Sequence, residues 1–353
     1  MSGTSLDGID VALIRTDGEN TVERGPSQTY AYSDGQRSIL RAALADAKNL
    51  ESREERPFGL ATAEAALTDW HVQAVESFLK ANPATIDVIG FHGQTVIHRP
   101  EIKLTVQLGD GKALAKKLRV PVVYDMRAAD VAAGGQGAPF VPVYHRALAA
   151  GLPERPIAFL NIGGVANITW IDANGEMIAF DTGPGNALLN DWAMRHLGIP
   201  QDTNGALALK GEVNEQVLDA ALAFPFFGQP PPKSLDRNAF EALSLAGLSP
   251  EDGAATLVAF TKFAILFAND WFPSPPRRYI VCGGGRHNPA IMYSLPGGKH
   301  LFQTAEEAGL NGDSIEAEAW AYLAVRSQKK LPLSFPMTTG VRKPMTGGVL
   351  ALP

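Results

Sequence analysis

Two glycine-containing hairpins, widely separated in the sequence, constrain the fold of this chain more than any other feature. The first fifteen residues, MSGTSLDGIDVALIR, predict a strand, a polar turn and a second strand. Residues 160–171, LNIGGVANITWI, repeat this plan with Gly163 and Gly164 at the turn. Glycine lets backbone amides approach an anion closely, so both turns are candidate phosphate sites. Two such hairpins predict two halves that face one nucleotide.

The first hairpin carries the chemical groups that a phosphate site needs. Gly3 and Gly8 bring the backbone close to an anion, Thr4 and Ser5 add hydroxyls, and Asp7 offers a hard oxygen ligand for a phosphate-bound Mg²⁺. A CGGG turn at 282–285 is a further candidate. The predicted phosphate-binding residues are Gly3, Thr4, Ser5, Leu6, Asp7, Gly8, Ile9, Asp10, Gly163, Gly164, Gly283, Gly284, Gly285 and Asn288. The alternative is an ordinary turn in which Asp7 only stabilises the loop.

The motifs of two common nucleotide-binding folds are absent or incomplete. The sequence contains no GxxxxGK[ST] phosphate loop. Residues 178–188, IAFDTGPGNAL, are similar to a dinucleotide fingerprint, with Asp202 at the distance of a ribose partner. However, Leu188 occupies the third glycine position, and the segment lies in the middle of the chain. Dinucleotide binding is therefore disfavoured.

Composition excludes several other classes of protein. With 353 residues the chain is long enough for two domains. Its net charge of -6 and the lack of a basic stripe argue against a nucleic-acid partner. Charges or glycines interrupt every apolar stretch before 18 residues, and the first residues lack a signal-peptide pattern, so we expect a cytoplasmic protein with no membrane partner. The single cysteine, Cys282, is expected to pack at a strand end without a catalytic role.

Strands and helices alternate along the first half of the chain, which predicts a largely parallel sheet covered by helices. The glycine-rich segment 132–139, AAGGQGAP, interrupts this alternation and is the expected domain boundary. We predict one domain from residue 1 to 132, joined by 335–353, and a second from 133 to 334. The expected strands cover 29–32, 87–91, 104–108, 120–124, 157–162, 177–180 and 279–282. The expected helices cover 36–49, 60–80, 186–196, 213–222, 253–268 and 313–327.

The order of motifs along the whole chain resembles that of the anhydro-N-acetylmuramic acid kinase family. The matching segments are MSGTSLDGID (1–10), GFHGQTVIHRP (90–100), DMRAADVAAGGQGAPFVP (125–142), LNIGGVANIT (160–169), FDTGPGNALLND (180–191), DTNGALA (202–208), PPPKSLDR (230–237), CGGGRHNP (282–289), GDSIEAEAWAYLA (312–324) and TTGVRKP (338–344). Met126 replaces an aromatic residue of the family, and Phe140 replaces an aliphatic one. The family has several apolar residues before MSGTS, so we expect the first strand to be short here.

The resemblance implies a two-domain α/β fold of the actin and hexokinase type, related to ribonuclease H, with a nucleotide cleft between the domains. It implies a transferase that uses ATP and Mg²⁺. Such an enzyme hydrolytically opens the 1,6-anhydro ring of 1,6-anhydro-N-acetylmuramic acid and phosphorylates the sugar to N-acetylmuramic acid 6-phosphate in peptidoglycan recycling. The implied partner is this small amino sugar, and the protein is expected to be a homodimer.

The reaction needs a base that takes a proton from water, and Asp181 is the candidate. The apolar segment 177–180 precedes it and TGPG follows, so its carboxylate should stand on a rigid mount. The family places its catalytic base in the same DTGPGN motif. The structural alternative is a cap on the following helix, a role that Asn186 fits better.

Two charged residues are candidates for binding the sugar. Arg127 suits the lactyl carboxylate of the substrate, although pairing with Asp125 and Asp130 is an equal alternative. Glu316 begins a helix, where the helix dipole favours any glutamate, but the family uses the matching residue to hold the sugar. Glu318, two residues later, should face elsewhere.

Further polar residues are candidates on weaker patterns. His92 and Gln94 follow a buried strand and are expected to line the sugar pocket, with a purely structural histidine as the alternative. Lys233 and Arg237 flank a triple proline and are candidates for a lid.

Two other functions compete with the kinase. A sugar-independent ATPase of the actin or chaperone class would need a peptide-binding or polymerising module, and the predicted domains leave no length for one. A sugar-sensing regulator would need a DNA-binding segment. Release of ADP with and without the sugar separates the kinase from the ATPase.

Overall fold

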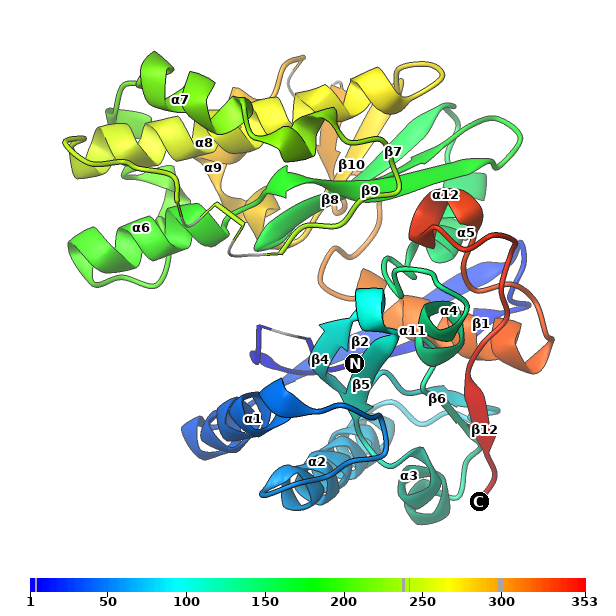
Figure 1. Ribbon diagram of the computed structural model, residues 1–353. Coiled ribbons are helices and arrows are strands. Elements are labelled where there is room, and N and C mark those ends of the chain that lie inside the picture. The colour runs from blue at the N-terminus through cyan, green and yellow to red at the C-terminus, as the bar shows by residue number, and fades with distance from the viewer. Residues whose placement is uncertain (4, 237–238, 241, 298–300) are drawn as a thin grey trace. The chain divides into compact units, whose positions relative to one another are not determined.

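The computed structural model describes residues 1–3, 5–236, 239–240, 242–297 and 301–353 (Figure 1). The chain divides into two compact units, Met1–Gly151 with Ser314–Pro353, and Leu152–Asp313. The division after Gly151 differs from the expected boundary at 132/133. The reason is that helix α5 (Pro142–Ala150) packs against α11 (Ile315–Gln328), and the hydroxyl of Tyr144 donates a hydrogen bond to Glu318. Both helices therefore belong to the first unit.

The first unit contains small sheets instead of the large parallel sheet expected. Its strands are β1 (Gly8–Thr16), β2 (Val22–Ala31), β3 (Ile89–Gly90), β4 (Gln94–Arg99), β5 (Leu104–Leu108), β6 (Val122–Tyr124) and β12 (Val349–Ala351). β1 pairs antiparallel with β2, and β4 pairs antiparallel with β5. In the third sheet β6 pairs parallel with β3 and antiparallel with β12. The prediction of a largely parallel sheet was wrong here because β4 and β12, which it did not include, both pair antiparallel.

The opening segment also differs from the predicted hairpin. Among its described residues before Gly8, only Ser2 pairs with a strand, in a single antiparallel bridge to Ile9. The real hairpin is the next one, β1 with the ten-residue strand β2, whose end was the expected strand near residue 29. Gly8 is needed for this pairing, because a Cβ atom there would lie 2.4 Å from the carbonyl oxygen of Tyr30.

Helices cover the sheets of the first unit. They are α1 (Asp34–Asp46), α2 (Leu60–Ala81), α3 (Gly111–Leu118), α4 (Ala128–Ala132), α5, α11 and α12 (Pro336–Thr339), with 3₁₀ turns η1 (Ala47–Asn49) and η2 (Pro100–Ile102). A capping box begins α1: the Ser33 hydroxyl accepts from the Gln36 backbone, and the Gln36 side chain accepts from the Ser33 backbone. Both α2 and α11 pack against β1, which fixes the position of the residues that precede it.

The second unit is built on one mixed sheet in the order β11-β10-β7-β8-β9. Its strands are β7 (Ile157–Ile162), β8 (Val165–Ile171), β9 (Met177–Pro184), β10 (Arg278–Cys282) and β11 (Phe302–Thr304). β11, β10 and β7 run parallel, whereas β8 and β9 follow as antiparallel hairpins. The predicted bounds of β7 are confirmed, but β9 continues past residue 180 to Pro184.

Helices of the second unit cover its sheet (Figure 1). They are α6 (Ala187–Leu197), α7 (Glu215–Leu222), α8 (Pro250–Phe267) and α9 (Pro289–Ser294), with 3₁₀ turns η3 (Thr203–Gly205), η4 (Ala208–Lys210), η5 (Pro225–Gly228), η6 (Ala268–Trp271) and η7 (Gly284–His287). α8 lies against β9, and α6, α7 and α9 pack on α8. Within the described ranges, no helix is long and apolar enough to cross a membrane. Each unit thus combines helices with at least one mixed sheet, which confirms the predicted α/β class.

Candidate functional site

Asp181 lies within β9 of the second unit, where two neighbouring segments hold it. Its backbone pairs with Asn167 of β8, and its amide donates to the carbonyl of Lys233 at 3.0 Å. Its carboxylate Oδ2 accepts a hydrogen bond of 2.8 Å from the backbone amide of Leu235. The alternative role of a helix cap does not apply, because Asn186 occupies the N-cap position of α6, although its side chain makes no capping hydrogen bond.

Burial makes the carboxyl group of Asp181 a weaker acid than that of an exposed aspartate. The surrounding protein disfavours the charged carboxylate and raises the pKa of Asp181 from 3.8 to about 7. The Leu235 amide opposes this effect, because a hydrogen bond to the carboxylate stabilises its ionised form. A carboxyl group that titrates near neutral pH has the acidity that suits a general base.

The glycine turns predicted in the second unit lie together at the end of β7. The carbonyls of Gly163 and Gly164 accept hydrogen bonds from the amides of residues 185–187, which lead into α6. A Cβ on Gly185 would lie 2.1 Å from the carbonyl oxygen of Gly163. Gly283, at φ +74°, packs so closely that a Cβ would approach Asn161 Oδ1 to 2.4 Å. Two turns distant in sequence therefore form one surface of bare backbone.

Arg286, which was not among the predicted site residues, anchors the CGGG turn. Arg286 donates to the carbonyl of Gly283 at 2.9 Å and forms ion pairs with Glu306 and Asp313 at 2.9 and 2.8 Å. Its guanidinium is almost completely buried, so it holds the turn in place and is not accessible to a ligand. Its place directly after three glycines was the signal that could have identified it.

Asn288 has an internal role that its prediction as a nucleotide contact did not anticipate. Its Oδ1 accepts from the amide of Ala290 at 3.0 Å and so caps α9. Its Nδ2 donates to the carbonyl of Asp202 at 3.3 Å. Since the oxygen and the nitrogen of the amide both have partners within the protein, Asn288 shapes the loop.

In the first unit the N-terminal turn is held by its backbone and its apolar side chains. Leu6 adopts φ 57°, and its amide donates to the carbonyl of Gly3 at 3.2 Å. Leu6 and Ile9 are buried in the core, which leaves only their backbone for a ligand. Asp10 accepts from the hydroxyl of Thr29 at 2.6 Å. Thr4, a predicted phosphate ligand, lies outside the described residues.

Among the described residues of this turn, Ser5 and Asp7 have exposed polar side chains. The carboxylate of Asp7 makes no hydrogen bond or ion pair with any residue that the structure describes, whereas its backbone carbonyl accepts from Tyr32 at 2.9 Å. No group of three His, Cys, Asp or Glu side chains arranged for a metal occurs in the described part of the chain. A single free carboxylate fits Mg²⁺ that is held mainly by phosphate and water.

Arg127 and His92 form a chain of hydrogen bonds to the N-terminal turn. Arg127 Nε donates to His92 Nε2 at 3.2 Å, and His92 Nδ1 lies 3.2 Å from the carbonyl oxygen of Ser2, which assigns the proton to Nδ1. Burial and the nearby guanidinium lower the pKa of His92 well below 6.5, so the imidazole is neutral. Burial also lowers the pKa of Arg127 to about 10, which leaves it charged at neutral pH.

Arg127 does not pair with its neighbouring aspartates, so that alternative is wrong for the described structure. Asp125 binds Arg53, and Asp130 accepts from the amide of Gly137 and the hydroxyl of Thr339, both at 2.6 Å. Arg127 itself donates to the Gly137 carbonyl at 2.7 Å, and its guanidinium lies 5.0 Å from the centroid of the Trp320 ring. The guanidinium is thus oriented without being neutralised by a hydrogen-bonded carboxylate.

Glu316 lies in the first turn of α11. Its carboxylate and the guanidinium of Arg127 interact through their charges but form no hydrogen bond in the described structure. Its side chain is exposed, and no hydrogen bond joins its carboxylate to the residues described here. The surrounding protein removes water from the Glu316 carboxylate, which raises its pKa, and the positive charge of Arg127 opposes this rise. Glu318, as predicted, faces elsewhere: it is buried and accepts from Tyr144 at 2.6 Å and Ser314 at 2.8 Å.

Two other predicted residues have structural roles. Gln94 is fully buried, its Oε1 accepts from the Ser2 hydroxyl at 2.6 Å, and its Nε2 donates to the carbonyl of Thr95, which leaves its side chain out of reach of a sugar. Lys233 is also buried, which contradicts its prediction as part of a lid. Arg237 lies outside the described residues.

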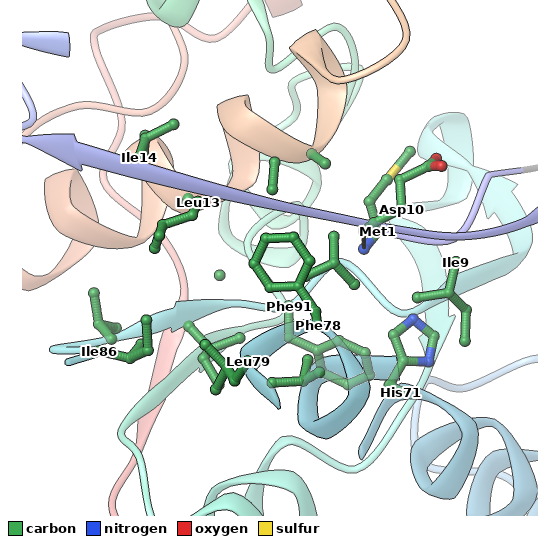
Figure 2. A pocket seen from close by; sticks show the side chains of 18 of the residues that line it. Met1, Ile9, Asp10, Leu13, Ile14, His71, Phe78, Leu79, Ile86 and Phe91 are labelled. Carbon is green, nitrogen blue, oxygen red and sulfur yellow. Dashed lines mark hydrogen bonds between the residues drawn. The ribbon is translucent and has the colours of Figure 1, made fainter. Parts of the chain in front are cut away.

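A cavity of about 100 Å³ in the first unit is not the candidate site (Figure 2). It lies between β1 and the segment 86–91, and its lining is apolar apart from Asp10, His71 and the amino group of Met1. Burial lowers the pKa of His71 to about 3, so it is neutral, and its Nε2 has no partner among the described residues. No arginine or lysine of the described chain lines this cavity, and its mainly apolar lining does not suit a phosphate or a carboxylate.

Glycine turns, a carboxyl group that titrates near neutrality and a charged arginine are typical of enzymes that act on small anionic molecules. The family model described as "Anhydro-N-acetylmuramic acid kinase" matches residues 1–352. The chain belongs to this family of phosphotransferases.

Curated relatives agree with this assignment. A protein of Rhodopseudomonas palustris named anhydro-N-acetylmuramic acid kinase is 54% identical over 359 residues, which cover 100% of this chain and 98% of the relative. One of Rhodospirillum rubrum with the same name is 50% identical over 355 residues, covering 99% and 92%. Among solved structures, the activator of the 2-hydroxyisocaproyl-CoA dehydratase from Clostridium difficile with bound ADPNP matches over 94% of this chain and 96% of the activator chain. The TM-score of this match is 0.37 and the sequence identity is 12%.

Proposed function

We propose that this protein is an ATP-dependent kinase that opens the 1,6-anhydro ring of 1,6-anhydro-N-acetylmuramic acid and phosphorylates the oxygen released. The product is N-acetylmuramic acid 6-phosphate, an intermediate of peptidoglycan recycling. Family membership supports the reaction class. The observation that carries the proposal is the Asp181 carboxyl group, mounted within β9 and brought by burial to a pKa of about 7.

Asp181 is proposed to act as the general base. It takes a proton from a water molecule while the water oxygen forms a bond to the anomeric carbon. The bond between that carbon and the bridging oxygen breaks, and its electron pair goes to the oxygen that becomes O6. This oxygen attacks the γ-phosphorus of ATP, and ADP leaves with the electrons of the broken P–O bond. The proton on Asp181 returns to solvent after the product leaves.

The remaining residues are proposed to bind and orient the substrates. ATP is assigned to the N-terminal turn Gly3–Asp10 and to the glycine turns at 163–164 and 283–285, because bare backbone amides suit phosphate oxygens. Asp7 is assigned to Mg²⁺, since its carboxylate is exposed and has no hydrogen-bonding partner among the described residues. When bound, Mg²⁺ would neutralise charge on the phosphates.

The sugar is assigned to Arg127 and Glu316. The guanidinium of Arg127 is held by His92 and keeps its charge, so it suits the lactyl carboxylate of the substrate. The exposed carboxylate of Glu316 accepts hydrogen bonds, so it suits sugar hydroxyls or the amide group. We also propose that the protein is cytoplasmic and a homodimer; light scattering of the purified protein tests the dimer, and fractionation of cells tests the location.

The decisive experiment replaces Asp181 with asparagine and follows the reaction in ¹⁸O-labelled water. The variant keeps the size of the side chain but loses the proton acceptor, so the rate should fall by about 10² to 10⁴ while both substrates still bind. In the wild type, the label should appear on the anomeric carbon and not in the transferred phosphate. Asp219→Asn, which changes an exposed carboxylate on α7, is the matched control and should keep full activity.

Three results would contradict the proposal. If Asp181→Asn keeps more than about a tenth of the wild-type rate, Asp181 is not the general base. If ¹⁸O from water appears in the transferred phosphate, water attacks phosphorus and not the anomeric carbon. ADP release at an equal rate without the sugar would favour a sugar-independent ATPase instead.

A further inference from the structure

A buried lysine of the second unit has no carboxylate partner among the residues that the structure describes. Lys233 is only 7% exposed, and its ammonium donates to the carbonyls of Phe226 and Phe227 at 3.0 and 3.4 Å. The ammonium also lies 4.6 Å from the centroid of the Phe226 ring and 5.4 Å from that of Trp271. Burial lowers the pKa of Lys233 to about 8, so a substantial fraction of the charge persists at neutral pH.

The backbone of this lysine and of the residue two positions after it holds Asp181. The carbonyl of Lys233 accepts from the amide of Asp181 at 3.0 Å, and two residues later the amide of Leu235 donates to the Asp181 carboxylate at 2.8 Å. The segment 233–235 therefore lies along β9 and contacts both the backbone and the side chain of the base. It belongs to no helix or strand, so the hydrogen bonds of a sheet do not fix it.

The side chain of Lys233 attaches the segment 233–235 to a neighbouring turn. It reaches from this segment to the carbonyls of the 3₁₀ turn η5, which is itself packed into the core through Phe226 and Phe227. The faces of Phe226 and Trp271 stabilise the cation there without neutralising it. An apolar side chain of equal length would fill the space but could not bind the carbonyls.

We propose that Lys233 is a positioning residue for Asp181: its ammonium fixes residues 233–235 against η5 and thereby keeps the Leu235 amide on the carboxylate of the base. The inference rests on the proposed function only in naming Asp181 as the base. Without this attachment the amide moves away, the carboxylate loses its hydrogen bond, and its proton is held more tightly.

The test compares Lys233→Met with the wild type. The pKa of Asp181 is measured by NMR from its ¹³C-labelled carboxyl carbon, without substrates and with Asp181→Asn for assignment. Loss of one hydrogen bond to the carboxylate should raise this pKa by about one unit. The acid limb of the pH–rate profile should move by the same amount, and kcat at pH 7 should fall about fivefold with KM for ATP and sugar nearly unchanged, because the ionised fraction of a base falls from about a half to about a tenth when its pKa rises from about 7 to about 8.

Two further variants separate positioning from general damage. Lys233→Arg keeps a cationic donor and should stay closer to the wild type than methionine does. Lys262→Met removes another ammonium that lies over an aromatic ring, that of Phe263 at 4.7 Å, in the same unit and should change neither the pKa nor the profile. If Lys233→Met does not fold, Lys233→Gln, which keeps a donor for the carbonyls, should show a smaller rise of the same sign.

The proposal is overturned if the pKa of Asp181 and the pH profile stay unchanged in the folded Lys233 variants, or if Lys262→Met produces the same shift. Asp181→Asn distinguishes this failure from that of the proposed function. If that variant keeps its activity, the proposed base is wrong, whereas the NMR titration still decides whether Lys233 holds the carboxylate. If it is inactive and the titrations agree, only the positioning role fails.

Discussion

Replacing Asp181 with asparagine is expected to make the folded protein more stable at alkaline pH while it removes the activity. Burial raises the pKa of this carboxyl group from 3.8 to about 7, so ionising it costs more in the folded state than in the unfolded chain. The difference of about 3 units corresponds to about 4 kcal/mol at 1.36 kcal/mol per unit. Because the side chain is partly exposed, we take about half of this figure, or about 2 kcal/mol.

The sign of the effect depends on pH in a defined way. Below the unfolded pKa of 3.8 the carboxyl group is neutral in both states and costs nothing. As pH rises from about 4 to above 7, the unfolded chain ionises first and the folded state loses relative stability. Asparagine carries no such charge, so the advantage of the variant should appear across this window and be complete near pH 8.

Urea unfolding of wild type and variant at pH 4 and pH 8, followed by circular dichroism, measures this difference. Amide exchange in β9 reports on the second unit separately, since a chain of two units need not unfold in one step. Asp219→Asn, which changes an exposed carboxylate of the same unit, should show no such pH dependence. The reasoning is refuted if the stability difference between wild type and Asp181→Asn is the same at both pH values.

Two more predictions concern the first unit. Arg127→Ala should raise KM for the sugar by about 10- to 100-fold in steady-state kinetics, because it removes a charge-assisted hydrogen bond, and an unchanged KM would exclude Arg127 from the sugar site. Asp7→Ala should weaken the dependence of kcat on Mg²⁺ without lowering the melting temperature, since Asp7 is exposed; an unaltered Mg²⁺ titration would count against its role.

Part of the candidate site could be predicted from the sequence because its signals are local. An apolar run followed by TGPG indicated that Asp181 stands on a strand, and β9 contains it. Paired glycines marked the turn at 163–164, which lies between β7 and β8. The positions of Gln94 and Lys233 in the sequence, beside buried or proline-rich segments, did not reveal that their polar groups are satisfied inside the protein.

The sequence by itself determined the elements whose periodicity and turn residues lie within a few neighbouring positions, such as β5 and β7, and its motifs determined the family. Tertiary structure alone decided which strands pair and in which direction, and it placed α11 in the first unit with α5. It also decided the acidity of Asp181, through burial and an amide 54 residues away. The physical reason is that hydrophobic pattern and turn chemistry act along the chain, whereas desolvation and hydrogen bonding of a side chain depend on segments that only folding brings together.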